Sequence, residues 1–161
     1  MNIDLRILEL LEDEATLSPK DMAMMLDSDE KTVKKRIDKL KKDGIIKKYK
    51  TVIDWKKAGK RSATAMIQVK VTPQEKAGFA KICKDLARDP KVQDVFVATG
   101  EYDLVIFIKA ETLDEISEFI TEKLAPKKDV LGTYTHIILS EFKRDGAILS
   151  DDGKKRLPVT I

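Results

Sequence analysis

Reactive side chains are scarce in this chain of 161 residues, which contains one cysteine, one histidine and one tryptophan. Because Cys83 is alone, an intrachain disulfide and a cysteine-based zinc site are excluded, and its amphipathic surroundings predict a buried small hydrophobe. His136 falls within a predicted strand and no nucleophile motif accompanies it. The motifs HExxH and GxSxG and a glycine-rich phosphate loop are missing too. We therefore expect no catalytic residue, no metal site and no cofactor.

Long apolar runs are also missing. The longest clear one is Leu104–Ile108, far below the ~20 residues that span a bilayer. The first residues, MNID, carry neither the basic region nor the apolar core of a signal peptide. We expect a cytoplasmic protein with no membrane partner. Its composition, 42% hydrophobic and 37% charged, provides enough apolar material for two small cores.

Charge is unevenly distributed, although the formal net charge is only +3. Residues 1–30 contain nine acidic and two basic side chains, whereas residues 31–50 contain two acidic and ten basic ones. A charged run alone is usually a solvated face, and lysine-rich surfaces also occur in heat-stable proteins. This reversal, however, coincides with a pattern that is typical of DNA-binding proteins.

That pattern extends from Ser18 to Gly44 and predicts two short helices joined by a tight turn. Ser18 is a favourable N-cap followed by Pro19, Asp29 caps the second helix, and Gly44 ends it. A preceding helix, predicted for residues 4–13, supplies apolar residues at helical spacing to pack on the other two. The sequence thus predicts a three-helix helix-turn-helix domain in residues 1–53.

The second helix of this pair presents cations away from its apolar stripe, as a helix that enters the DNA major groove would. By analogy with such readers, Lys31, Thr32 and Lys35 approach base edges, and Lys34, Arg36 and Lys39 contact the backbone. For Arg36 a salt bridge within the domain is the alternative. Ile45–Ile53 has the composition of a strand or wing, whose Lys47, Lys48 and Lys50 either contact phosphates or form a solvated edge.

A polar segment with Gly59 and Trp55, residues 54–61, is the expected linker, and beyond it the periodicity changes. The order is β-α-β-β-α-β, so residues 62–142 are expected to form a ferredoxin-like, split βαβ domain in an α+β protein. Residues 143–161 form a tail that we expect to fray. The expected elements are strands at 62–71, 92–99, 104–110 and 130–142, and helices at 73–88 and 112–124.

Such a domain covers one face of its sheet with helices and leaves the other open. Alternation places Thr64, Met66, Gln68 and Lys70 on the open face, which neighbouring strands extend with Val105 and Phe107. Packing of two sheets would hide these residues in a homodimer. It would also bring two helix-turn-helix units together, as a palindromic site requires.

The stretches ILELLEDEA, EKTVKKRIDKLKKDGIIKKYKTVID and FVATGEYDLVIFI resemble the Lrp/AsnC, or feast/famine, transcription regulators over nearly the whole chain. The resemblance implies a simple or winged helix-turn-helix domain followed by a βαββαβ domain of the RAM type. It further implies dimers that assemble into higher oligomers, often octamers, and small effectors, usually amino acids, bound near the turn Gly100–Asp103. Asp29 and Glu30 depart from the family, in which small hydroxyl residues are frequent at this point.

The hairpin at that turn suits a sensor. Gly100 lacks a Cβ, so backbone N–H groups can approach a carboxylate, Asp103 can pair with an ammonium group, and Tyr102 can close the site. The alternative is a tight turn that needs Gly and Asp for local geometry. Thr133 and Thr135 are weaker candidates for the walls of the pocket.

The sequence leads to three hypotheses about function. The first is a regulator that binds specific duplex DNA and responds to a small molecule, which we expect to be an amino acid. The second is an architectural protein that wraps DNA without an effector. The third is an enzyme similar to tetrapyrrole decarboxylases of related two-domain fold, which the single histidine argues against.

Overall fold

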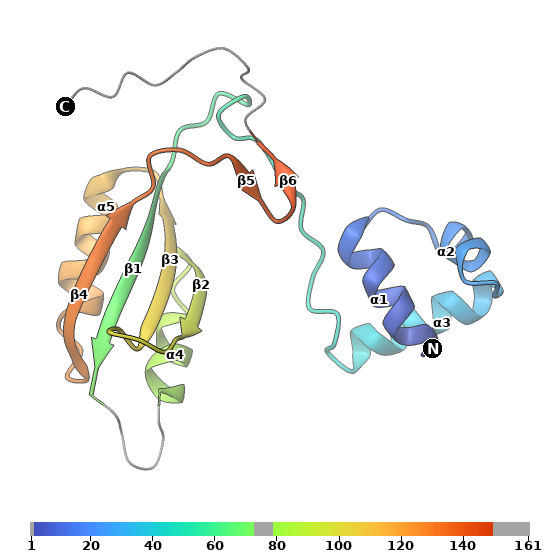
Figure 1. The fold of residues 1–161 in the computed structure, drawn as a ribbon, viewed down its shortest axis with the longest axis horizontal. Helices are drawn as coiled ribbons and strands as arrows, with labels where there is room; N and C mark the ends of the chain where they lie inside the picture. Colours follow the sequence, from blue (N-terminus) through green and yellow to red (C-terminus); the bar gives the residue numbers. More distant parts are fainter. Residues whose placement is uncertain (1, 73–78, 150–161) are drawn as a thin grey trace. The chain divides into compact units, whose positions relative to one another are not determined.

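The computed structural model describes residues 2–72 and 79–149. It divides the chain into two compact units, one ending at Val52 and the other beginning at Ile53. Figure 1 shows that the first unit is helical and that the second is built on a sheet. The buried hydrophobic residues form two separate clusters, one in each unit.

Three helices make the first unit, as the sequence predicts, and side chains cap all three. Asn2, Ser18 and Asp29 each accept a hydrogen bond from a backbone N–H of the first turn that follows. The chain passes from the second helix to the third through Asp27, whose φ of 49° is left-handed. The helices are α1 (Ile3–Asp13), α2 (Pro19–Met25) and α3 (Glu30–Lys42).

The third helix ends where the sequence predicts. Gly44 has a φ of 68°, and the Ile45 backbone N–H donates to the Leu40 carbonyl at 2.9 Å, which satisfies a carbonyl at the helix end. Val33, Ile37 and Leu40 point inward and join Ile7 and Met22 in the core. The opposite side of α3 is therefore left to solvent.

The strand or wing expected for Ile45–Ile53 is wrong. Residues 45–53 form no strand, because a strand needs a neighbour with which to exchange backbone hydrogen bonds and the described part of the first unit is otherwise helical. Ile46 packs against the helical core, whereas Ile45 and Tyr49 are exposed.

The second unit has the predicted βαββαβ order, and its strands form an antiparallel sheet in the order β2-β3-β1-β4. Its second helix changes to a π-helical turn, η1, at Phe119. The part of the first helix expected at 73–78 lies outside the described residues. The elements are β1 (Ala63–Val71), α4 (Ala80–Leu86), β2 (Val92–Val97), β3 (Leu104–Ala110), α5 (Leu113–Glu118), η1 (Phe119–Leu124) and β4 (Val130–Ile137).

The helices cover one face of this sheet (Figure 1). On β1, Ala65, Ile67 and Val69 are fully buried beneath them, and the residues between are only half-buried, which confirms the predicted alternation. Ile67 pairs with Ile106 of β3 and with Thr135 of β4, so the core runs across the central strands. Phe119 completes it from the helical layer.

Two boundaries near the end of the second unit were predicted wrongly. The fourth strand ends at Ile137 rather than at residue 142, because β1 begins at Ala63 and offers no partner further along. Residues 143–148, expected to fray, pair as a hairpin of β5 (Lys143–Arg144) and β6 (Ala147–Ile148). Gly146, with a φ of 82°, makes its turn. Residues 150–161 of the expected tail lie outside the described residues.

The segment expected to be a linker, residues 54–61, is instead a structured part of the second unit. Asp54 accepts the Lys57 backbone N–H at 3.0 Å, and Lys60 donates its own to the Trp55 carbonyl at 2.9 Å. The ammonium group of Lys109, on β3, lies 5.6 Å from the centre of the Trp55 ring. Trp55 therefore attaches this turn to the sheet. None of the helices in residues 2–72 and 79–149 has the length and apolarity to cross a membrane.

Candidate functional site

The outward face of α3 carries a set of lysines with little to neutralise them. Lys31 and Lys35 are one turn apart and Lys42 follows two turns after Lys35, so all three lie on the side opposite the core. Within the described residues, no carboxylate lies within ion-pair distance of any of them. The exposed lysines of the helix are Lys31, Lys34, Lys35, Lys39, Lys41 and Lys42.

Arg36 does not belong to this exposed set. Its Nη1 lies 2.9 Å from Oδ1 of Asp4 on α1, and the two side chains are 42% and 30% exposed. The structure therefore shows the alternative that the sequence left open, an ion pair that ties α3 to α1. Thr32 is also only half-exposed, at the first turn of the helix.

Asp29, which precedes α3, is occupied as a cap. Its Oδ1 accepts the Thr32 backbone N–H at 2.8 Å, and the hydrogen bonds from Thr32 lower the pKa of the carboxyl. A carboxylate held in this way compensates the positive end of the helix dipole. Asp38 is the other acid of interest, because it is exposed between Lys35 and Lys42.

Beyond α3, the cations Lys47 and Lys48 are exposed, on a segment that has no strand. Lys41 lies over the ring of Tyr49, with its Nζ 5.0 Å from the ring centre, so this segment folds back toward the end of the helix. Sequence analysis overlooked Lys41 and Lys42 as members of the cationic surface. The seven-residue interval between Lys35 and Lys42 was the signal that would have included the latter.

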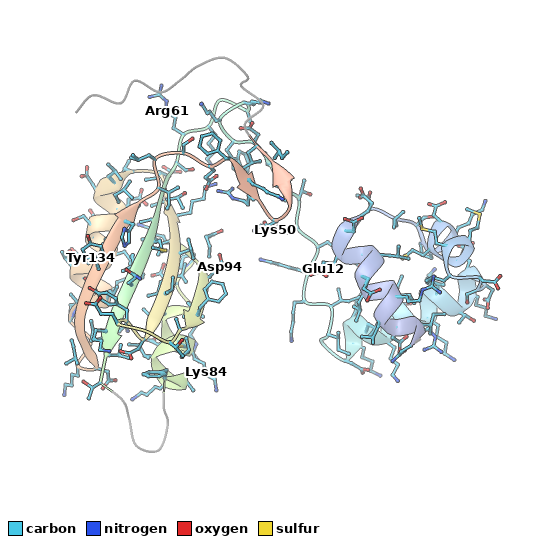
Figure 2. The ribbon with its side chains drawn as sticks, in the orientation of Figure 1. Glu12, Lys50, Arg61, Lys84, Asp94 and Tyr134 are labelled. Carbon is cyan, nitrogen blue, oxygen red and sulfur yellow. The ribbon has the colours of Figure 1, made fainter. Side chains whose placement is uncertain are left out.

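In the second unit, a hollow of about 370 Å³ lies beside the hairpin that connects β2 to β3. Tyr102 is in its wall, and the ring of Tyr102 stacks against that of Tyr134 at 6.4 Å between centres. Figure 2 marks Tyr134 on β4. The lining residues are Lys70, Glu101, Tyr102, Leu131, Gly132 and Thr133, and we call the space the hairpin hollow.

Asp103 is placed differently from the expectation that it pairs with a ligand. Its carboxylate accepts the Val71 backbone N–H at 3.0 Å and lies 3.4 Å from the Lys70 ammonium group. The Val71 hydrogen bond, more than Lys70, lowers the pKa of this carboxyl. Asp103 therefore fastens the hairpin to the end of β1, and it does not line the hairpin hollow.

The other predicted effector residues are divided. Tyr102 and Thr133 line the hairpin hollow, whereas Gly100 and Thr135 do not. Gly100 has a φ of 132°, which is the backbone reason for glycine in this turn. Thr135 pairs with Ile67 on the helix-covered side.

Two residues that sequence analysis did not propose, Lys70 and Glu101, bring opposite charges to this hollow. Lys70 was predicted on the open face of the sheet, and Glu101 is in the GEYD turn, so both were within the highlighted segments. Glu101 is exposed, and among the described residues it has no hydrogen-bond or ion-pair partner. The site therefore has one free carboxylate.

The open face of the sheet carries half-buried side chains as predicted, and several of them interact. His136 Nε2 lies 3.2 Å from Gln68 Oε1, and its ring meets that of Tyr134 edge-on at 4.7 Å. Phe107 and Phe96 pair edge-on at 6.4 Å. His136 is thus a hydrogen-bonded strand residue. Cys83 is half-buried on α4, where burial raises the pKa of its thiol.

Comparison with known proteins agrees with this arrangement. Residues 2–47 match the model of a winged helix-turn-helix DNA-binding domain, and residues 64–148 match that of the Lrp/AsnC ligand binding domain. The chain is 35% identical, over 96% of its length and 94% of the relative's, to the uncharacterized HTH-type transcriptional regulator YugG of Bacillus subtilis.

Solved structures show the same fold at lower identity. The leucine response regulatory protein LrpA of Mycobacterium tuberculosis superposes with a TM-score of 0.73 at 17% identity, covering 93% of this chain and 99% of that one. A complex of the transcriptional regulator NMB0573 from Neisseria meningitidis with L-Met superposes with a TM-score of 0.68 at 19% identity, covering 89% and 93%. The two domain-model matches and the 35% identical relative from Bacillus subtilis show that the chain belongs to the Lrp/AsnC family of transcription regulators, which bind DNA and a ligand rather than catalyse a reaction.

Proposed function

We propose that this regulator binds specific duplex DNA through the exposed face of α3 and that an amino acid in the hairpin hollow adjusts its assembly or its affinity for DNA. The charged pair that flanks the hollow carries the effector half of the proposal. The row of unpaired lysines on α3 supports the DNA half.

On α3, the residues nearest the start of the helix are assigned to base edges and the later ones to phosphates. Lys31, Thr32 and Lys35 contact base edges in the major groove, as residues near the start of the recognition helix do in other helix-turn-helix proteins. Phosphate contacts come from other exposed lysines of α3 and of the segment that follows it. Arg36 is removed from this interface, since Asp4 already holds its guanidinium group. The phosphate-contacting set is Lys34, Lys39, Lys42, Lys47 and Lys48.

An amino acid at neutral pH presents a carboxylate and an ammonium group a few ångströms apart. Lys70, whose ammonium group also lies 3.4 Å from Asp103, attracts the first and Glu101 the second, while Tyr102 and Leu131 contact the side chain. The volume of about 370 Å³ lies at the small end of the range for ligand sites, which suits a single amino acid better than a larger ligand. The L-Met complex of the structural neighbour supports this ligand class.

Assembly is proposed to begin by packing of two open sheet faces. This face exposes apolar side chains, such as Phe96 at 52%, next to half-buried Phe107 and Met66. Covering them in a homodimer removes apolar area from water, and dimers then join into higher oligomers, of which the octamer expected from the resemblance is one. A Phe107→Glu change is expected to lower the mass measured by light scattering. An unchanged mass would refute the use of this face.

The effector half is tested by calorimetric titration of the full chain with each of the twenty common amino acids. Glu101→Gln removes the partner of the ammonium group and is expected to weaken binding about tenfold, the effect of losing one charge-assisted hydrogen bond. Asp94→Asn is the matched control, because Asp94 is an exposed carboxylate on β2 outside the lining of the hairpin hollow (Figure 2).

Two outcomes would contradict the proposal. Binding that Glu101→Gln and Asp94→Asn weaken equally would move the ligand elsewhere. Failure of every amino acid to bind at millimolar concentration would remove the sensor and favour the alternative of an architectural protein that wraps DNA without an effector.

A further inference from the structure

A second and larger hollow, of about 790 Å³, opens at the other end of the same sheet. Thr64, near the start of β1, lines it, whereas Lys70, near the end of that strand, lines the hairpin hollow. Its walls come from the turn at 54–61, from Lys109 at the end of β3 and from residues 138–141 after β4. We call it the Trp55 hollow.

Aromatic and apolar surface forms part of this wall. Trp55 is 37% exposed, and the ammonium groups of Lys60 and Lys109 lie 5.5 and 5.6 Å from the centre of its ring. Leu139, the neighbouring apolar residue, is 94% exposed. A ligand here therefore meets a flat indole, an aliphatic side chain and two cations held close to the ring.

The acidic side chains of the wall are already engaged. Asp54 lies 3.8 Å from Lys57, and Glu141 is paired with Arg144. Among the described residues, Lys56, Lys60 and Arg61 have no carboxylate partner. The hollow is thus positively charged and offers no free carboxylate to an ammonium group, so a neutral zwitterion is poorly matched and an anion is well matched.

We propose that the Trp55 hollow is a second ligand site, which binds a nucleotide. Phosphate suits the unpaired cations because it carries more than one negative charge and accepts paired hydrogen bonds from a guanidinium group such as that of Arg61. The base contacts Trp55 and Leu139, and the flexible Lys60 side chain moves from the indole to the phosphate. The nucleotide is either free in solution or part of the bound DNA, and the site is independent of the effector function of the hairpin hollow.

Because Trp55 is the only tryptophan of the chain, its fluorescence reports on this hollow alone. We would titrate the full chain with adenosine 5′-monophosphate and, in parallel, with adenosine and with inorganic phosphate. Saturable quenching by the monophosphate, with each fragment binding about tenfold more weakly, is the expected result. The double variant Lys60→Ala/Arg61→Ala is expected to bind the monophosphate about tenfold more weakly than the unmodified chain.

Lys81→Ala/Lys84→Ala is the matched control, because it removes the same charge from exposed positions of α4. Figure 2 marks Arg61 near one end of the sheet and Lys84 near the other. Circular dichroism would verify that both double variants fold. Equal weakening in the two variants, or no saturable quenching by either the monophosphate or duplex DNA, would overturn the proposal.

A duplex arm separates the two sources of nucleotide. If the hollow takes a nucleotide of bound DNA, Lys60→Ala/Arg61→Ala reduces the salt dependence of duplex binding by about one unit of slope per lost phosphate contact, and the α4 control does not. If it takes a free nucleotide, the salt dependence is unchanged and only the monophosphate titration responds. Trp55 emission could instead change when the chain assembles and not when the monophosphate or duplex DNA is added. That result would show that another copy of the chain covers the hollow, and would refute the proposal.

Discussion

Lys35 and Arg36 are neighbours on α3, yet the structure gives them opposite predicted roles. Lys35 is exposed and has no ion-pair partner among the described residues, whereas Arg36 is 2.9 Å from Asp4. Replacing each by alanine in turn removes one positive charge from adjacent positions of the same helix. The two variants should therefore differ in kind, the first in DNA affinity and the second in folding stability.

The size of the DNA effect follows from the number of available cations. If Lys31, Lys34, Lys35, Lys39 and Lys42 each neutralise one phosphate charge, the two lysines at base edges included, log K should fall with log salt at a slope of about −4.5 per helix, since each neutralised charge contributes about 0.9. Lys35→Ala should reduce that slope by about 0.9. Between 50 and 200 mM salt, its affinity should then fall about 3.5-fold less than that of the unmodified chain.

The stability effect is smaller, because the Arg36–Asp4 pair is partly exposed. With side chains 42% and 30% exposed, it contributes about 0.5 kcal/mol after solvent screening. Arg36→Ala should lower the free energy of unfolding by about that amount. A double-mutant cycle with Asp4→Ala should give a coupling energy of the same size. The salt slope should stay unchanged.

Fluorescence anisotropy with a labelled duplex at several salt concentrations measures the slope, and urea titration measures stability. The reasoning is refuted if Arg36→Ala flattens the salt dependence as much as Lys35→Ala does. It is also refuted if Lys35→Ala leaves the slope unchanged, since the exposed face of α3 would then lie away from the phosphates.

Further predictions concern charge and packing elsewhere in the chain. Asp38→Asn removes the exposed acid between Lys35 and Lys42, so it should tighten binding to non-operator duplex by about twofold at low salt, as measured by anisotropy. Gly44→Ala should destabilise the first unit by about 1 kcal/mol in urea, because the φ of 68° is strained for alanine. Phe119→Ala, at a side chain only 2% exposed, should destabilise the second unit by about 3–5 kcal/mol and leave helical melting of the first unchanged. The Val71 N–H and Lys70 lower the pKa of Asp103, so the carboxylate's contribution to folding stability is present above its ordinary pKa and is lost as pH falls below about 4. In that acidic range, the midpoint of thermal unfolding should therefore decline more steeply in the unmodified chain than in Asp103→Asn.

The elements that could be predicted from the sequence are those whose determinants are local. Ser18, Asp29 and Gly44 mark helix ends through hydrogen bonds and backbone angles within a few residues of themselves. The alternation in Ala63–Val71 likewise shows which side of the strand is buried. These features were confirmed because no distant partner is needed to satisfy them.

The errors occurred where a partner decides the outcome. Residues 45–53 have strand composition but no strand beside them, and the fourth strand ends because β1 does. In the hairpin, Asp103 was predicted to pair with a ligand, but its carboxylate accepts a hydrogen bond from the Val71 backbone N–H. Lys70 is on β1 and Glu101 is in the turn between β2 and β3, so only the folded sheet brings both to the hairpin hollow.

The two hydrophobic clusters share no residue. Substitutions among the helices of the first unit can therefore accumulate without disturbing the packing beneath the sheet, and the converse also holds. For a regulator of this family, the DNA-binding half and the ligand-binding half can therefore diverge separately, because each keeps its own hydrophobic core.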